Sequence, residues 1–545
     1  MSKKAKLITI LLAMALLLSV FSSCKKTEEP IASEKPTAEK TEEATETKQE
    51  EEEPQEAELE HMDISITQWS IGNSFPEDGA TDAIQDAIYE KFNITFTAKP
   101  VTWGDAEEKI NLWAASGELP DLIGARAIEA SPQYSQWIDD GLVRALPDDL
   151  SMYPTLEEII NTGDVQAYSY NDKNYFFPRT FSLDPAYGAV LRGLYVRKDW
   201  MDDLGLDFPQ SEEEFMDLMR AFTLQDPDKN GKDDTYGLGG GEILSGTFNN
   251  YGYIHGTWFK EEDGKYRLGN TGANALQWAS VLRQMNKEKT LDPGFDSIPY
   301  EERIQEFMTG RIGVFSDAVS AVDSHKKAWD EINPDKNFYE CVAFLPLWTV
   351  DDKPIYRYSE KVYWSETFVE GSVDDAKMDR ICMIYDFMYS REGIALMYFG
   401  IEGVDFEYTG EDSVQLLSGK NEDGTYIRPS YQTFDGLTNL FTWRFQLRFP
   451  TDPYWTDELK EFYAAEYARV GMLDDPGIDW SIQAIVTPAK SELSIDPTAD
   501  WMEFVFDETD ATDEELYAAM WANWVANGYQ DAIDEVTAAA AAMGK

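Results

Sequence analysis

Cysteine and histidine are scarce in this sequence. Its 545 residues include 3 Cys and 3 His. Zinc sites in proteins are built mainly from Cys and His side chains, so a zinc site is poorly supplied here. Two of the cysteines, Cys341 and Cys382, lie in apolar segments, and we expect both to be buried free thiols. A disulfide between them stays open at this point.

The sequence also lacks the short motifs that mark common classes of enzyme. It contains no nucleophile elbow, no Ser-His-Asp pattern, no Walker loop and no glycine fingerprint for a dinucleotide. We therefore predict that the protein is not an enzyme. A surface glycoside hydrolase stays an alternative, because such enzymes need only two carboxylates and aromatic residues that bind sugars.

Positive charge is in short supply as well. Lys and Arg number 46 against 102 Asp and Glu, which gives a formal net charge of -56 at pH 7. Such a surface repels nucleic acid and polyanionic ligands at long range. The charge favours neutral or cationic ligands, and we expect no nucleic-acid partner.

The first 24 residues have the parts of an export signal. Three lysines precede an apolar run over residues 7–20, and two serines stand just before Cys24. The run is too short to span a bilayer comfortably. The segment resembles bacterial lipoprotein signals, in which the cysteine is diacylated and becomes the first residue. The resemblance implies a signal peptide over residues 1–23 and a lipid anchor on Cys24; a simple cleaved signal or a buried N-terminal helix are the alternatives.

Residues 24–61 have the composition of a tether. Glu, Lys, Thr, Ala, Gln and Pro dominate this stretch, and it has almost no large aliphatic residues that could form a core. A charged linker of this kind repels itself and extends. We therefore expect a folded body that begins near Met62 and is held on the extracellular face of the cell membrane.

The body alternates between strand-like and helix-like segments. Strand patterns cover residues 63–69, 94–101 and 119–123, and helix patterns cover residues 80–92 and 105–115. Repeated units of strand, helix and strand indicate an α/β layer fold with a largely parallel sheet. Ligands bind beyond the carboxyl ends of the strands in such sheets. The loops that contain Trp69, Trp103 and Arg126 are therefore candidate binding loops.

A series of short segments resembles landmarks of extracellular solute-binding proteins. These segments occur in order along the chain at residues 111–123, 141–147, 175–179, 194–200, 204–209 and 397–404. Together they resemble family 1 of these proteins, and in it the large lipoprotein branch that includes the alginate-oligosaccharide-binding proteins of ABC transporters. The resemblance implies two α/β lobes joined by a hinge. We place one lobe at residues 62–178 and 306–350, and the other at residues 179–305 and 351–545.

One motif indicates calcium from its chemistry. Asp226, Asp228, Asn230 and Asp234 stand at positions 1, 3, 5 and 9 of an EF-hand-like loop, and Lys232 would contribute its backbone carbonyl at position 7. Gly237 replaces the Glu of position 12, so a full EF-hand is excluded. The resembling proteins hold calcium with a similar loop, in which an acidic residue stands just after the position of Asp234. In this sequence that position is occupied by Thr235. An Asx-rich turn without metal is the alternative.

Candidate ligand residues are aromatic and arginine side chains in loop-like contexts. Aromatic faces suit sugar rings, because apolar CH groups pack on the π surface while hydroxyls bond outward. Each of these residues has core packing or surface ion pairing as its alternative role. The candidates are Trp69, Trp103, Tyr187, Trp258, Trp364 and Trp443, with Arg126, Arg179 and Arg444 as partners for hydroxyls or a carboxylate.

These features together predict a receptor that is a monomer, closes its lobes around an oligosaccharide and delivers it to the permease subunits of an ABC importer. We expect a neutral or weakly charged sugar, because the acidic body disfavours a polyanion unless local Arg groups or Ca²⁺ offset the charge. A receptor for peptides or another nutrient shares the same fold and tether, so it remains the main alternative.

Overall fold

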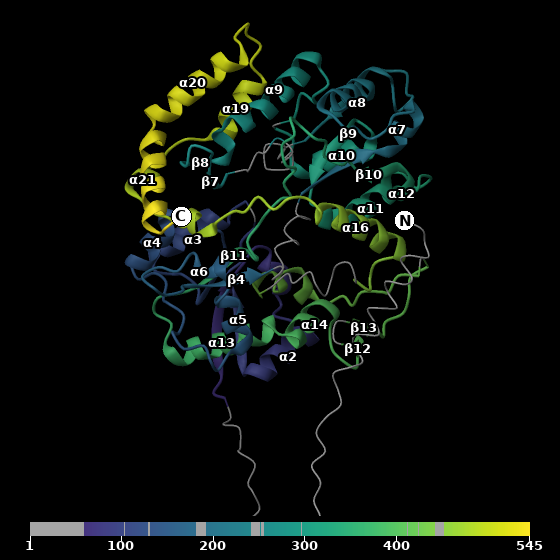
Figure 1. Ribbon diagram of the computed structural model, residues 1–545. Helices are drawn as coiled ribbons and strands as arrows, with labels where there is room; N and C mark the ends of the chain where they lie inside the picture. Colours follow the sequence, from purple (N-terminus) through teal and green to yellow (C-terminus); the bar gives the residue numbers. More distant parts are fainter. Residues whose placement is uncertain are drawn as a thin grey trace, which may run out of the picture. The chain divides into compact units, whose positions relative to one another are not determined.

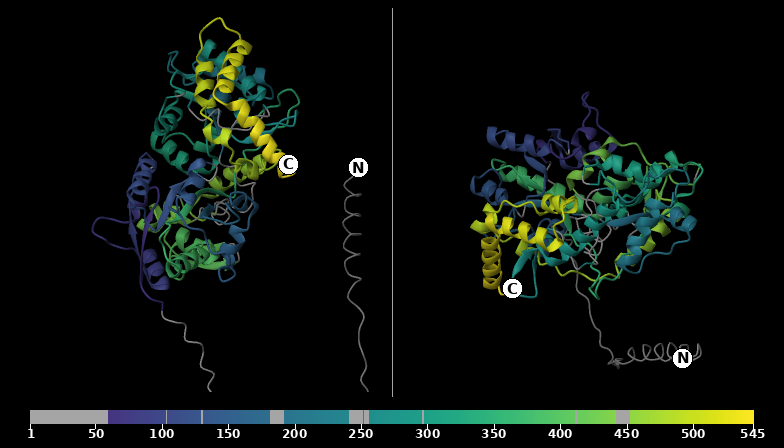
Figure 2. Two further views of the ribbon diagram at one scale, coloured as in Figure 1. Left: turned by 90° about the vertical axis from the view of Figure 1, so that its left-hand side faces the viewer. Right: turned by 90° about the horizontal axis from the view of Figure 1, so that it is seen from above.

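The computed structural model describes residues 59–545 except 103, 129–130, 181–191, 241–250, 252–255, 296, 411–412, 423 and 442–451. Cys24 and the predicted tether up to residue 58 lie outside the described residues. Two sheets, each covered by helices, make up the body (Figures 1 and 2). None of the described helices has the length and the apolar composition needed to cross a membrane.

The first sheet has five strands in the order β2-β1-β3-β11-β4. The strands are β1 (Met62–Thr67), β2 (Ile94–Ala98), β3 (Leu122–Arg126), β4 (Phe176–Thr180) and β11 (Tyr363–Val369). β1 runs parallel to β2 and β3, whereas β11 is antiparallel to both β3 and β4. The carboxyl ends of β1, β3 and β4 therefore meet the amino end of β11 at one edge of the sheet.

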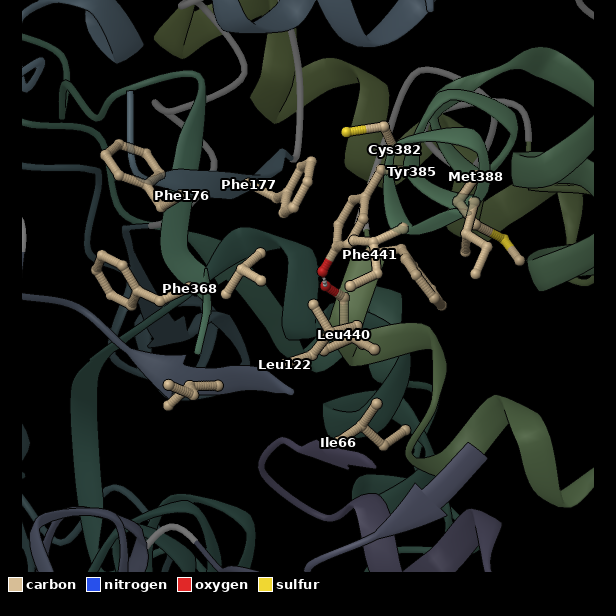
Figure 3. Packing of buried hydrophobic residues seen from close by; sticks show 14 of the residues in the cluster. Ile66, Leu122, Phe176, Phe177, Phe368, Cys382, Tyr385, Met388, Leu440 and Phe441 are labelled. Atoms are coloured by element: carbon tan, nitrogen blue, oxygen red, sulfur yellow. Dashed lines mark hydrogen bonds between the residues drawn. The ribbon is translucent and has the colours of Figure 1, made fainter. Parts of the chain in front are cut away.

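Helices and apolar side chains bury this sheet. The helices are α2 (Ala83–Phe92), α3 (Ala106–Ser116), α4 (Pro132–Asp139), α5 (Pro154–Ile160), α6 (Gly163–Gln166), α13 (Asp375–Tyr389), α14 (Arg391–Phe399) and α15 (Thr438–Phe441), with the 3-10 turns η1 (Ile71–Ser74) and η6 (Gln432–Asp435). Figure 3 shows the core, in which the ring of Phe177 stacks on Tyr385 with centroids 3.9 Å apart. The hairpin β12 (Phe406–Gly410) and β13 (Ser413–Leu416) packs against α14. We call residues 59–180 and 363–441 the first lobe.

The second sheet has four strands in the order β10-β5-β9-β6. They are β5 (Gly193–Arg197), β6 (Tyr236–Leu238), β9 (Ile312–Asp317) and β10 (Val342–Phe344). Leu194 and Val196 of β5 enter one apolar cluster and Tyr195 enters another, as the two-residue period of a strand requires. Both faces of this sheet are therefore buried.

Helices from two distant parts of the chain cover the second sheet. They are α7 (Lys198–Leu204), α8 (Glu212–Leu224), α9 (Ala273–Glu288), α10 (Tyr300–Thr309), α11 (Val322–Ile332), α12 (Phe338–Cys341), α16 (Asp457–Val470), α17 (Trp480–Gln483), α18 (Pro488–Glu492), α19 (Pro497–Val505), α20 (Asp513–Ala526) and α21 (Tyr529–Ala542), with the turns η4 (Gly269–Thr271) and η5 (Val319–Ala321) and the hairpin β7 (Trp258–Lys260) and β8 (Tyr266–Leu268). We call residues 193–350 and 457–545 the second lobe.

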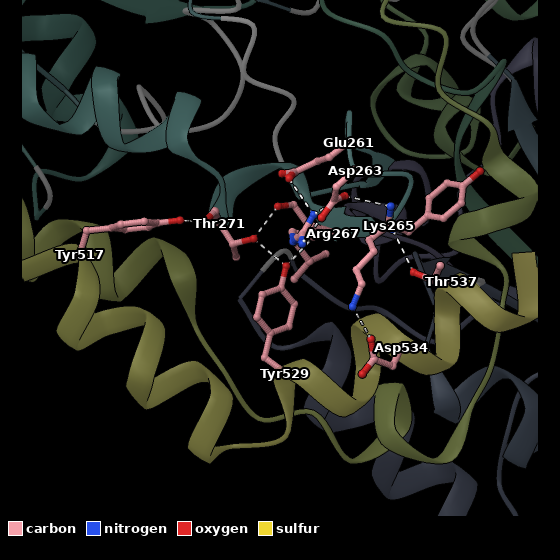
Figure 4. Close-up of polar contacts among 11 residues, drawn as sticks. Glu261, Asp263, Lys265, Arg267, Thr271, Tyr517, Tyr529, Asp534 and Thr537 are labelled. Atoms are coloured by element: carbon pink, nitrogen blue, oxygen red, sulfur yellow. Dashed lines mark hydrogen bonds and ion pairs between the residues drawn. The ribbon is translucent and has the colours of Figure 1, made fainter. Parts of the chain in front are cut away.

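The last two helices are tied to the hairpin by polar contacts (Figure 4). The Tyr529 hydroxyl accepts a hydrogen bond from the backbone N–H of Leu268 at 2.8 Å, and Lys265 forms an ion pair with Asp534 at 2.8 Å. The Tyr517 hydroxyl donates to the carbonyl of Thr271 at 2.7 Å. These contacts fasten the C-terminal helices to the second lobe.

The local predictions near the N-terminal end of the body are confirmed, and the lobe boundaries differ from those predicted. The predicted strands and helices between residues 63 and 123 correspond to β1, α2, β2, α3 and β3. However, β9 and β10 pair in the second sheet, although residues 306–350 were assigned to the first lobe, and β11 pairs in the first sheet, although residues 351–545 were assigned to the second lobe. The helices of residues 457–545 pack in the second lobe, as predicted. The pairing of β11 between β3 and β4 decides its lobe, and this long-range contact leaves no local pattern in the sequence.

The predicted parallel pairing holds for only part of the two sheets. In the second sheet β5 is antiparallel to β9 and to β10, and only β6 pairs with β9 in parallel. Along the chain, the lobe changes between β4 and β5, between β10 and β11, and between α15 and α16. Both Cys341 and Cys382 are free and buried, so the expected free thiols are confirmed.

Candidate ligand-binding site

The carboxyl edge of the first sheet gathers aromatic and charged side chains. Trp69 follows β1, Arg126 is the last residue of β3, and Arg179 is the last residue but one of β4. Trp364 stands at the amino end of β11, and its neighbour Ser365 pairs with Arg179 across the strands. Trp69 and Arg126 thus lie at the same edge of the sheet, although Arg126, which was expected in a loop, is the last residue of β3.

Arg179 lies between two tryptophans at this edge. Its guanidinium carbon is 5.3 Å from the ring centroid of Trp69 and 4.8 Å from that of Trp364, and the two indoles are 5.4 Å apart. Cation–π contacts of this kind hold both planes in place. Arg179 is 1% exposed, and burial lowers its pKa to about 9, so it remains charged at neutral pH. The three side chains form a rigid aromatic and cationic group.

Trp364 also connects the two lobes. It is partly buried and packs against the core of the first lobe. The same side chain packs against the apolar cluster of the second lobe that contains Tyr195 and Phe344. A ligand that contacts Trp364 would therefore act at a point where both lobes meet.

Arg126 is a second buried arginine at this edge. It is 3% exposed, and its guanidinium carbon lies 4.9 Å from the ring of Trp137. One terminal nitrogen donates to the Gln133 side chain, but the buried Nε has no hydrogen-bond partner among the described residues. Burial lowers the pKa of Arg126, while Glu107 and Glu366 act in the opposite direction. Glu366 stands opposite Arg126 in the sheet and is fully buried.

A pocket of about 550 Å³ lies next to this edge. Asn439 lines the pocket, and its backbone carbonyl accepts hydrogen bonds from Gln68 Nε2 (2.9 Å) and Arg179 Nη1 (3.4 Å). The pocket is thus joined to the strand edge by direct contacts. Its described lining residues are Met397, Tyr398, Arg428, Pro429, Ser430, Tyr431, Gln432, Phe434, Thr438 and Asn439.

Trp258, another predicted ligand residue, does not join this site. Trp258 lies in β7, is 5% exposed and packs 6.1 Å from Tyr529 in the core of the second lobe. Its predicted place in a loop was wrong, because the hairpin turns the ring inward. Trp103, Tyr187, Trp443 and Arg444 lie outside the described residues.

The pocket residues were missed by the prediction. Tyr398 is part of the landmark at residues 397–404, but nothing local marks it as a ligand residue. Arg428 and Asn439 follow a hairpin and a 3-10 turn rather than a strand of the main sheet. The rule that ligands bind after parallel strands therefore could not find them.

The loop over residues 226–234 joins α8 to β6 and holds the predicted calcium ligands. The Asp226 carboxylate accepts hydrogen bonds from the backbone N–H groups of Asn230 and Gly231, both at 3.0 Å. The Asn230 Nδ2 atom donates to Asp228 at 2.6 Å and to Asp234 at 2.9 Å. Two carboxylates therefore converge on one point, where the Asn230 amide lies.

This convergence is electrostatically unfavourable. Burial raises the pKa of Asp228 above 3.8, and the carboxylates of Asp226 and Asp234 raise it further. Within the described residues, no group of three or more His, Cys, Asp and Glu side chains has an arrangement that could hold a metal ion. At Gly237 a side chain would meet the backbone of Met219 at 2.7 Å, so no Glu fits at position 12 of the loop.

Comparison with known proteins gives one family match and several relatives. A family model described as bacterial extracellular solute-binding protein matches residues 72–369. The polygalacturonan/rhamnogalacturonan-binding protein YtcQ of Bacillus subtilis (strain 168) is 25% identical over 375 residues, which cover 65% of this chain and 68% of that protein. Lipoprotein LipO of the same organism is 25% identical over 386 residues, which cover 66% of this chain and 69% of that protein.

A solved structure shares the fold at lower identity. The alginate-binding protein AlgQ2 without calcium ion superposes with a TM-score of 0.64 and is 14% identical, with 87% of this chain and 97% of that chain covered. At this identity the likeness concerns the fold alone. It confirms the predicted α/β architecture of two lobes.

Proposed function

Because the chain belongs to the bacterial extracellular solute-binding proteins, we propose that it is the substrate-binding lipoprotein of an ABC importer and that its ligand is an oligosaccharide. The ligand would bind between the two lobes, and the closed form would present it to permease subunits in the membrane. Proteins of this family bind solutes, so no catalytic step is assigned to the chain.

The aromatic and cationic group at the sheet edge is the observation that carries this proposal. Trp69 and Trp364 lie 5.4 Å apart and are held by Arg179. Trp364 is partly exposed, and an indole face packs on the CH groups of sugar rings, whereas the buried Trp69 and Arg179 hold that indole in place. The adjacent pocket offers further neutral donors and acceptors, among them Ser430, Gln432 and Thr438. Such a mixture of flat apolar faces and polar groups suits a sugar chain.

Closure around the ligand follows from where Trp364 lies. Its side chain packs against apolar clusters of both lobes, so a sugar placed on it can contact both. A ligand shifts the equilibrium between open and closed forms only by its difference in affinity for the two. Contacts made to both lobes at once supply such a difference, and three chain crossings provide the hinge.

Anchoring is the second part of the proposal. The signal-like segment ends at Cys24, and the relative LipO is named a lipoprotein. Two acyl chains on Cys24 would hold the protein stably on the extracellular face of the membrane. The acidic stretch at residues 25–60 would then act as an extended spacer between lipid and body.

We further propose that the 226–234 loop binds Ca²⁺ with a structural role. Asp228 and Asp234 already converge on the Asn230 amide, and rotation of that amide would turn its oxygen toward the same point. Asp226 and the Lys232 carbonyl would complete an oxygen-only ligand set, which Ca²⁺ prefers. A bound cation would also relieve the repulsion that raises the pKa of Asp228.

Two other functions share parts of this pattern. A receptor for peptides or another nutrient has the same fold and anchor, and its site would differ only in the ligand it selects. A glycoside hydrolase would need a pair of carboxylates on either side of a sugar, whereas the fully buried Glu366 is the acidic side chain that opposes Arg126 at the edge. The arrangement therefore favours binding over hydrolysis.

Calorimetric titration of the full chain in detergent with a panel of oligosaccharides and peptides tests the proposal. We expect at least one oligosaccharide to bind, and Trp364→Ala to weaken it by about tenfold or more, as for a buried aromatic contact residue. Trp521→Ala in α20 is the matched control, because Trp521 packs only within the second lobe. Tight binding of peptides with no response to any sugar would refute the proposal.

A further inference from the structure

The pocket beside the sheet edge has an unusual charge for this protein. The chain as a whole carries a formal charge of -56 at pH 7. Of the described residues that line the pocket, none is acidic, and Arg428 is the one charged residue. Long-range repulsion from the surface is screened over about 8 Å at physiological ionic strength. Among the described lining residues the guanidinium of Arg428 is thus the charge that acts on a ligand at short range.

Arg428 is held in place without an acidic partner. Its guanidinium carbon lies 5.1 Å from the ring of Phe434 and 5.1 Å from the ring of Tyr454. One N–H of Nη2 donates to the carbonyl of Tyr398 at 3.4 Å. Among the described residues no carboxylate forms an ion pair with Arg428. Since a guanidinium has five N–H donors, several remain for a ligand.

Asp405, an acidic residue near the pocket, makes hydrogen bonds to other groups. The Asp405 carboxylate accepts hydrogen bonds from the Tyr431 hydroxyl at 2.8 Å and from the backbone N–H of Ile401 at 2.7 Å. Tyr431 itself lines the pocket, whereas Asp405 is not among the described residues that line it. The positive charge of Arg428 is thus available to a ligand group.

From this arrangement we infer that the ligand is an acidic oligosaccharide and that Arg428 binds the carboxylate of one of its sugar units. The inference rests on the proposed function. A planar guanidinium matches a planar carboxylate through two parallel hydrogen bonds. A single arginine suits a single negative charge, whereas a phosphate group with nearly two charges would be repelled more strongly by the acidic body.

The rest of the pocket suits the remainder of that sugar unit. Gln432, Ser430 and Thr438 supply neutral partners for hydroxyls, and the volume of about 550 Å³ lies within the usual range for small ligands. Asn439 links the pocket to Arg179 by a hydrogen bond of 3.4 Å. An oligosaccharide with its acidic unit in the pocket would therefore extend toward Trp69 and Trp364.

Calorimetric titration of the full chain in detergent tests the inference with three ligands of equal length. These are an oligogalacturonate, its methyl ester and a neutral glucose oligomer. We expect the oligogalacturonate to bind the wild type at least about tenfold more tightly than its methyl ester, because esterification removes the charge and keeps the size. Arg428→Gln should weaken the oligogalacturonate by about ten- to a hundredfold and leave the ester nearly unchanged.

Two variants control this comparison. Lys287→Gln removes the same charge from an exposed position at the end of α9 and should change none of the affinities. Arg428→Lys keeps the charge without the planar fork, so it should retain part of the preference for the acid. A thermal melt of each variant checks folding. If Arg428→Gln fails to fold, the comparison of acid and ester on the wild type still decides the question.

The outcomes separate this inference from the proposed function. Equal binding of the acid and its ester, or an unchanged affinity of Arg428→Gln for the acid, would overturn the inference. Tight binding of the neutral oligomer alone would do the same while the proposed function stands. Binding of no sugar together with binding of peptides would overturn both. A strong preference for a sulfated oligomer of equal length would show that the pocket selects a sulfate group, and it would refute the inference that Arg428 binds a carboxylate.

Discussion

Calcium should raise the thermal stability of the protein through the 226–234 loop. Burial raises the pKa of Asp228, and the neighbouring carboxylates of Asp226 and Asp234 raise it further. Without a cation, Asp228 destabilises the folded state at pH values above its raised pKa. The reason is that its ionised form is less favourable in the folded protein than in the unfolded chain. A bound Ca²⁺ reverses that effect, since its charge favours the ionised form.

The size of the effect follows from linkage. The loop lacks the bidentate Glu, so we assume an affinity typical of extracellular sites, about 10⁻⁴ M. At about 10 mM Ca²⁺, roughly a hundred times that value, binding stabilises the folded state by about 2.7 kcal/mol. For a body of about 490 residues, with an unfolding entropy of about 2.1 cal/mol/K per residue, the melting temperature should rise by about 3 °C.

Differential scanning calorimetry in Ca²⁺ and in EGTA measures this shift. Mg²⁺ at the same concentration controls for screening of the net charge of -56. Asp228→Asn should abolish the calcium shift, and without calcium it should melt at or slightly above the wild type, because it removes a disfavoured charge. Asp510→Asn removes an exposed carboxylate elsewhere and should keep the shift.

The pH dependence gives the same reasoning a second test. Calcium binds the ionised form of Asp228, so the shift should decline as the pH falls toward the raised pKa, at a higher pH than for an ordinary Asp. An equal rise in Mg²⁺, or an equal rise in Asp228→Asn, would show general screening instead of a site. The absence of any rise in Ca²⁺ would refute the proposed metal.

Three further predictions concern stability and reactivity. Arg283→Met should destabilise the second lobe by about 2 kcal/mol in urea unfolding, because Arg283 is buried and its ion pairs with Asp507 (2.8 Å) and Asp513 (2.6 Å) are lost; an unchanged midpoint would contradict this. Leu122→Ala in β3 should cost about 2–5 kcal/mol with an unchanged m-value, since the side chain is fully buried, and a cost below about 1 kcal/mol would show that the site collapses. Cys382 should resist thiol reagents in the native protein, because burial raises its pKa to about 12, and should react only in denaturant; rapid native labelling at this residue would count against the packing.

Much of the first lobe could be predicted from local patterns. The strand at residues 63–69 and the helix at residues 80–92 were found because their hydrophobic periods are clear, and Ile64 and Ile66 are fully buried as expected. The loop with Trp69 was proposed as a binding loop because ligands bind beyond the carboxyl ends of parallel strands, and Trp69 does follow β1. These inferences needed only neighbours in sequence.

The pairing of distant strands and the pocket could not be predicted in this way. β11 enters the first sheet about 180 residues after β4, and no local signal distinguishes it from a strand of the second sheet. Trp258 has the surroundings of a loop residue, but its backbone N–H bonds to the side chain of Gln483, 225 positions away, which draws it into the core. Asn439 meets Gln68 across 371 positions. Such contacts depend on the whole fold.

The place of β11 has a consequence for how the protein is made. This strand lies between β3 and β4, so the central part of the first sheet is incomplete until residue 369 has been synthesised. By then all strands of the second sheet have already emerged. Until then β3 and β4 each have an edge without its partner strand, which delays stable folding of the sheet. The first lobe can therefore be completed only after every strand of the second sheet has been made.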